Sequence, residues 1–167
     1  MERMAAFDEN FRPIPGAAPV RGQPLPDGMY TLVCKVLIKH KDGTILITQR
    51  DPAKKFGGGM WEISGGGTAQ AGEDGETCIR RETFEETGIR LGEIKELSCV
   101  CLKGMRSFFV EYLAETDWEK DDITLQPGET VAYRWVTKEE LLAMPVKEIA
   151  TPRALEYVRE MAGGFPF

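Results

Sequence analysis

The chain has 167 residues, of which 42% are hydrophobic and 29% are charged, as is typical of one globular domain with a sizeable core. Its net charge of −6, without a lysine- or arginine-rich block, argues against the backbone of bulk nucleic acid as the main partner. No stretch approaches the ~20 apolar residues of a membrane-spanning helix, so no membrane partner is expected.

Residues 1–28 are rich in proline and glycine and are expected to form an extended arm with turns. Phe7, Phe11 and Ile14 could anchor this arm to the body of the protein or to a second subunit, so a homodimer is possible. A disordered leader is the alternative interpretation. Residues 1–10 carry charges and no apolar core of signal-peptide length, so the cytoplasm is the expected location.

Alternating apolar residues predict strands on both sides of a central acidic segment. The expected strands cover residues 30–39, 44–50, 60–64, 94–103, 105–114 and 131–136. The turn signal Asp42-Gly43 predicts a hairpin between the first two strands. A basic, glycine-rich loop at 51–59 precedes the third strand, and a polar loop at 115–130 precedes the last one.

Three helices are expected. The first is an acidic helix that begins at a cap, Thr68 or Asp74, and ends at Gly88. The second begins with a capping box formed by Thr137 and Glu140.

The third helix begins at Thr151-Pro152 and ends near Met161. Strands that flank a central helix, with two more helices at the C-terminal end, indicate a fold of the α/β class, layered around a mixed sheet. No internal repeat or linker is visible, so residues 29–167 are expected to form a single domain.

The four cysteines, Cys34, Cys78, Cys99 and Cys101, do not have the spacing of a zinc site. Cys99 and Cys101 are two residues apart in an expected strand and share a face, which disfavours a disulfide between them. All four are expected to be buried thiols of a reducing compartment.

Glu82, Glu85 and Glu86 share one face of the acidic helix, because each residue advances by roughly 100°. Like charges at this spacing destabilise a bare helix, so the cluster favours a compensating cation. Carboxylate oxygens are the ligands that hard divalent ions such as Mg²⁺ prefer. A solvated acidic face is the alternative for an arbitrary glutamate-rich helix.

The segment 67–89 resembles the signature of the Nudix hydrolases. That signature runs Gly, five residues, Glu, seven residues, Arg-Glu, an aliphatic residue, any residue, Glu-Glu, any residue, Gly and an aliphatic residue. The matching positions are Gly67, Glu73, Arg81, Glu82, Glu85, Glu86, Gly88 and Ile89. Thr83 stands where an aliphatic residue is usual, a departure that affects packing beneath the helix rather than charge.

The resemblance implies the Nudix fold, an α/β/α sandwich around a mixed sheet, over most of residues 30–161. It implies a metal-dependent pyrophosphohydrolase that cleaves a diphosphate linkage in a nucleoside diphosphate derivative or a related small molecule. The implied cofactor is Mg²⁺ or Mn²⁺, about one to three ions. The implied ligands are Glu82, Glu85 and Glu86, together with a backbone carbonyl of Gly66 or Gly67.

Other residues of the signature have expected supporting or catalytic roles. Glu73 and Arg81 are expected to form a salt bridge that ties the loop to the helix and orients the carboxylates, with a purely structural role as the alternative. A base must take a proton from the attacking water. Glu82 is the candidate base within the signature, and Glu129 is the candidate from a later loop.

Four basic residues are candidate contacts for substrate phosphates, although for any single one a solvated surface charge is the more common role. They are Arg50, Lys54, Lys55 and Arg106.

Two alternative functions remain open. The glycine-rich arm and the loop that contains Arg50 also resemble the Nudix branch of isopentenyl-diphosphate-isomerase-like enzymes, but no cysteine here has the sequence context typical of those enzymes. A non-catalytic, nucleotide-binding Nudix domain is the other alternative. Loss of signature carboxylates is its usual sign, and none is missing. The identity of the substrate does not follow from the signature, because specificity lies in other loops.

Overall fold

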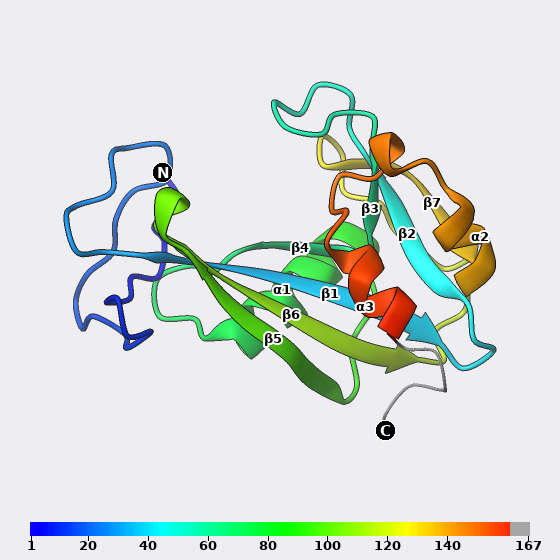
Figure 1. Ribbon diagram of the computed structural model, residues 1–167, viewed down its shortest axis with the longest axis horizontal. Coiled ribbons are helices and arrows are strands. Elements are labelled where there is room, and N and C mark those ends of the chain that lie inside the picture. Colours follow the sequence, from blue (N-terminus) through cyan, green and yellow to red (C-terminus); the bar gives the residue numbers. More distant parts are fainter. Residues whose placement is uncertain (161–167) are drawn as a thin grey trace.

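The computed structural model describes residues 1–160, and within them a long central strand, β1 (Thr31–His40), belongs to a seven-stranded sheet (Figure 1). The other strands are β2 (Ile45–Arg50), β3 (Trp61–Ile63), β4 (Gly65–Thr68), β5 (Ile94–Leu102), β6 (Ser107–Thr116) and β7 (Thr130–Val136). Their order is β3-β2-β1-β6-β5, with β4 also paired to β1 and β7 to β2. β1 and β6 are parallel whereas the other pairs are antiparallel, so the sheet is mixed.

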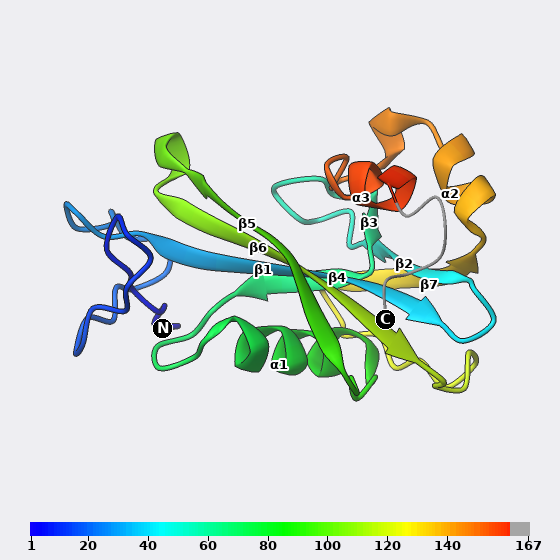
Figure 2. The same ribbon diagram turned by 60° about the horizontal axis from the view of Figure 1, so that its bottom comes forward.

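Helices cover both faces of this sheet. They are α1 (Gly75–Thr87), α2 (Lys138–Ala143) and α3 (Ala154–Glu160), with the short 3₁₀ helices η1 (Lys103–Met105) and η2 (Val146–Glu148). Figure 2 shows α1 on one side of β1 and β4, and α3 on the other side of the sheet. The predicted α/β sandwich around a mixed sheet is therefore confirmed.

The alternation of side chains along β1 builds two hydrophobic cores. Leu32, Cys34, Val36 and Ile38 belong to the core that contains Cys78 and Ile79 of α1. The core on the opposite face joins Leu37 to side chains of α2 and α3, among them Leu141, Leu155 and Val158. Burying each large apolar side chain contributes about 1.5–3 kcal/mol, so this pattern fixes α1, α2 and α3 on the sheet.

The sheet divides at Ser64, the residue between β3 and β4. β3 pairs with β2, whereas β4 pairs with β1, so the chain changes partner at this position. The Ser64 hydroxyl accepts a hydrogen bond from Ile38 N and donates one to Leu46 O, both at 2.8 Å. The Thr48 hydroxyl donates to Ser64 O at 2.8 Å. One buried serine therefore satisfies backbone groups that diverging strands would leave unpaired.

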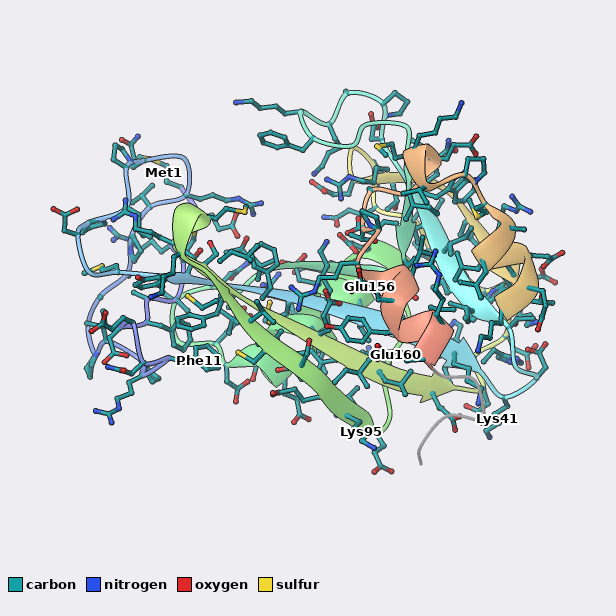
Figure 3. The ribbon with its side chains drawn as sticks, viewed as in Figure 1. Met1, Phe11, Lys41, Lys95, Glu156 and Glu160 are labelled. Carbon is teal, nitrogen blue, oxygen red and sulfur yellow. The ribbon has the colours of Figure 1, made fainter. Side chains whose placement is uncertain are left out.

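The N-terminal arm packs against its own domain. Phe7 and Tyr30 exchange backbone hydrogen bonds of 2.9 Å in both directions. The ring of Phe11 lies between those of Phe7 and Phe108 in tilted contacts, with centroid distances of 5.0 and 4.5 Å. Figure 3 shows Met1 and Phe11 at the opposite end of the molecule from Lys41, which follows β1.

Several elements differ from the expected ones. β4 was not expected as a strand, and it forms because its backbone pairs with β1 over residues 33–36. The expected hairpin between β1 and β2 reduces to one pair, Lys39 with Ile45, because β2 turns away toward β7. β6 begins at Ser107 because η1 occupies the preceding residues. The expected end of the last helix, Met161, lies outside the described residues.

The expectation of four buried cysteines is wrong. Cys34 and Cys78 are buried between β1 and α1, but Cys99 is exposed and Cys101 is partly exposed on β5. β5 is an edge strand, and none of its residues is fully buried. No helix within residues 1–160 is long and apolar enough to cross a bilayer.

Ser64→Ala is expected to lower the free energy of unfolding by about 3 kcal/mol, because it removes the partner of a buried N–H group and of a buried carbonyl. Denaturant titration measures this change. Ser98→Ala serves as control, since in the described part of the chain that half-buried hydroxyl bonds the hydroxyl of Tyr157 alone, and its expected cost is below about 1 kcal/mol. Equal costs for the two variants would contradict the role given to Ser64.

Candidate active site

α1 has well-defined ends that fix the position of its acidic face. Asp74 is the N-cap, and its carboxylate accepts a hydrogen bond from Thr77 N at 2.8 Å. Gly88 ends the helix in the left-handed conformation with φ 78°, and its N–H group bonds Phe84 O. Of the two expected caps, the structure therefore uses Asp74, and Gly88 is the expected stop.

The glycines of β4 allow α1 to approach the sheet very closely. A Cβ atom on Gly67 would lie 2.2 Å from the carboxyl carbon of Glu82, and one on Gly65 would lie 2.7 Å from Glu86 Oε2. Gly66 has φ 149°, and a Cβ atom there would lie 2.1 Å from Cys34 O. The carboxylates of Glu82 and Glu86 therefore occupy the space that side chains on β4 would take.

A cavity of about 320 Å³ lies beside these glycines and is lined mainly by charged side chains. Its carboxylates are Glu2, Glu82, Glu85, Glu86 and Glu129. Its cations are Arg21, Lys35, Arg50, Lys54 and Arg81. Acidic and basic groups from α1, the strands, two loops and the arm thus meet in one place.

Burial changes the protonation of the carboxylates on α1. Glu86 is 7% exposed, and burial, reinforced by the negative charge of Glu62, raises its pKa to about 8. Burial also raises the pKa of Glu82, and Glu85 and Glu2 act in the same direction. Such a concentration of carboxylates, held partly out of water, favours a bound cation.

Arg81 connects the loop before α1 to the carboxylates. Its guanidinium donates to both oxygens of Glu73, at 2.6 and 2.9 Å, so the expected Glu73–Arg81 salt bridge is present. The same group donates to Glu82 at 2.9 Å and to Glu85 at 3.1 Å. Glu73 in turn accepts a hydrogen bond from Gln70 N at 2.7 Å. Arg81 therefore orients two of the three glutamates.

A buried ionic network lies next to Glu86, and sequence reasoning missed two of its members. Glu62 is 3% exposed and forms ion pairs with Lys35 and, at 2.5 Å, with Arg50. Although burial opposes ionisation of Glu62, the two cations outweigh it and lower its pKa. The signal was present in the sequence, because Lys35 and Glu62 each stand between apolar residues of a strand.

The remaining candidate residues separate into two groups. Lys54 and Glu129 form an ion pair at the cavity, where Asp51 N donates to Glu129 O at 2.9 Å. Lys55 lies over the ring of Phe56, 5.5 Å from its centroid, and does not line the cavity.

Arg106 also lies away from the cavity. Its guanidinium donates to Leu25 O at 2.7 Å and to Pro26 O at 3.0 Å. The structure therefore does not place Arg106 with the other expected phosphate contacts, because this side chain holds the N-terminal arm.

The donor groups fit a hard divalent cation. Within residues 1–160, no three acidic, histidine or cysteine side chains already converge as a metal site, and Arg81 holds Glu82 and Glu85 in ion pairs. Carboxylates on one helix face, close to the backbone of Gly66 and Gly67, are nevertheless the oxygen donors that Mg²⁺ and Mn²⁺ take. Among the described residues Glu86 has no ion-pair partner, and its carboxylate accepts a 3.3 Å hydrogen bond from Gly66 N.

The chain is similar to known proteins both in sequence and in fold. The NUDIX domain family matches residues 29–159. The chain is 33% identical to an uncharacterised Nudix hydrolase of Listeria monocytogenes over 86% of this chain and 85% of that protein. It is 32% identical to an NAD-capped RNA hydrolase of Mannheimia succiniciproducens over 66% of this chain and 42% of that protein. A crystal structure from Deinococcus radiodurans superposes with a TM-score of 0.73, at 24% identity, over 95% of this chain and 98% of that one.

Thr83 packs beneath α1 without a partner for its hydroxyl. Its side chain is 1% exposed, and its Oγ1 is the buried side-chain oxygen or nitrogen within residues 1–160 that lacks a hydrogen bond. The neighbouring Thr87 differs, because its hydroxyl donates to Thr83 O at 2.6 Å and accepts from Ile89 N at 3.2 Å.

Thr83→Val is expected to raise the free energy of unfolding by about 1 kcal/mol, because it replaces an unpaired buried hydroxyl by a methyl group. Thr87→Val is the matched control and is expected to lower stability by about 1–2 kcal/mol, since it removes two hydrogen bonds. Denaturant titration of both variants checks the difference in sign. Destabilisation by Thr83→Val would show that its hydroxyl has a partner.

Proposed function

The chain belongs to the NUDIX family of hydrolases, and from this premise we propose that it is a metal-dependent pyrophosphohydrolase that cleaves a diphosphate linkage in a nucleoside diphosphate derivative. One observation carries the proposal. Glu82 and Glu86 lie directly over the glycines of β4, with Glu85 beside them, at a cavity that also contains basic side chains.

The proposed cofactor is Mg²⁺ or Mn²⁺, held by Glu82, Glu85 and Glu86 and by a carbonyl of the glycine strand. A bound divalent ion would neutralise the charge of two linked phosphates and promote the ionisation of a water molecule. The chain's own contribution is to hold the carboxylates in place, through the close contact with β4 and through Arg81.

Basic side chains opposite α1 are proposed to bind the phosphates. Arg50 is oriented by its ion pair with buried Glu62, and Lys54 reaches the cavity from the following loop. Glu82 on α1 and Glu129 are the two carboxylates proposed to take the proton of the attacking water. Both line the cavity, and Glu129 forms an ion pair with Lys54.

The proposed substrate class is a small molecule that contains a nucleotide and a diphosphate. The name of the Mannheimia relative supports this class, because NAD itself contains two nucleotides joined by a diphosphate.

A cytoplasmic location is also proposed. The four cysteines are free thiols, which suits a reducing compartment.

Glu86→Gln is expected to lower kcat by at least about 100-fold with the fold intact, because it removes a charged ligand from the group that stabilises the transition state. The assay uses Mg²⁺ and Mn²⁺ with NAD⁺, NADH, ADP-ribose, dinucleoside polyphosphates and nucleoside triphosphates. Turnover is compared on whichever compound the parent chain consumes fastest.

Glu93→Gln is the matched control for this substitution. It removes the same charge from an exposed position after α1 and is expected to leave kcat within about twofold. A near-normal rate of the Glu86 variant in saturating Mg²⁺ would contradict the proposal. Conversion of isopentenyl diphosphate to an isomer with its diphosphate intact would instead support an isomerase.

A further inference from the structure

The N-terminal arm contributes charged side chains to the cavity. Glu2 and Arg21 line it together with the glutamates of α1. The match to the NUDIX domain begins at residue 29, so both residues lie outside the part of the chain that the family describes. Glu2 lines the same cavity as Glu82, and its negative charge adds to the causes that raise the pKa of Glu82.

Backbone hydrogen bonds fix the arm at this position. Ala5 N donates to Ala69 O and Ala71 N to Arg3 O, both at 2.9 Å, so the first residues of the chain pair with the segment directly after β4. Arg21 N donates to Glu2 O at 3.0 Å, which holds the second part of the arm beside the first. The backbone of Arg21 is therefore held beside the cavity independently of the ion pair that its side chain forms.

Arg21 is held less firmly at the cavity than Arg81, Lys35 and Arg50 are. Arg81 contacts three glutamates, and Lys35 and Arg50 share buried Glu62. The partner of Arg21 is Glu2, at 2.9 Å, and the two side chains are 54% and 33% exposed. An exposed ion pair stabilises a protein little, so the guanidinium can exchange Glu2 for another anion. A phosphate is a suitable replacement, because it accepts two parallel hydrogen bonds from guanidinium.

We propose that Arg21 contacts the substrate and binds a phosphate beyond the two that lie at the glutamates of α1. The arm then forms one wall of the binding site within the same chain and favours substrates with three or more linked phosphates. This inference rests on the proposed function, since it takes the diphosphate to lie at Glu82 and Glu86.

The test compares two ligands that differ by one phosphate group. Isothermal titration calorimetry in Mg²⁺ measures the full chain with α,β-methylene-ADP and with the bis-methylene analogue of ATP, whose bridges resist hydrolysis. Arg21→Ala is expected to weaken binding of the triphosphate analogue by about tenfold and to leave the diphosphate analogue within about twofold, because only the longer ligand reaches the arm.

Matched variants separate the contact from an effect on the arm. Arg12→Ala changes an exposed arginine of the same arm that does not line the cavity, and it is expected to leave both affinities unchanged. Arg21→Lys keeps the charge but loses the planar guanidinium group that can donate two parallel hydrogen bonds. An intermediate loss of affinity is therefore expected for the triphosphate analogue alone. Glu2→Gln removes the competing carboxylate and is expected to strengthen binding of that analogue.

The results distinguish failure of this inference from failure of the proposed function. If the parent chain binds both analogues and Arg21→Ala affects neither, or weakens both equally, Arg21 does not contact a third phosphate. The proposed diphosphate site would then still stand. If the parent chain binds neither analogue in Mg²⁺, both proposals fail together.

Discussion

The close approach of α1 to the glycine strand β4 is the contact on which the rest of the site depends. Without Cβ atoms at Gly65 and Gly67, the carboxylates of Glu86 and Glu82 lie directly on the backbone. This contact removes Glu86 from water. The nearby carboxylate of Glu62 is neutralised by its ion pairs with Lys35 and Arg50. Packing and electrostatics are therefore linked. A side chain at Gly65 or Gly67 would push α1 away from the sheet and so move the carboxylates out of the cavity.

Much of the fold follows from local patterns in the sequence. β1 and β6 are predictable because apolar residues alternate along them, and α1 is predictable from its acidic face and its caps. β4 was missed because glycine has a low strand propensity, and its pairing depends on an edge of β1 that β2 leaves open. Such a partner change at Ser64 is a tertiary effect with no local signal.

The site was partly predictable for a similar reason. The glutamates of α1 and their arginine lie within one short segment, so spacing alone places them together. Lys35 and Glu62 come from different strands, and only the sheet register brings them into contact. Arg106 illustrates the opposite error, because a basic residue near a turn looks like a phosphate contact, whereas its guanidinium binds backbone carbonyls of the arm.

The parallel pairing of β1 with β6 has a consequence for how this chain folds during its synthesis. Thr31 pairs with Ser107 and His40 with Thr116, so the two central strands are separated by 76 positions along the chain. During synthesis, β1 has no permanent neighbour on that side until β6 has left the ribosome. β4 and α1 lie between β1 and β6 in the sequence. Both must therefore be synthesised before β1 and β6 can pair.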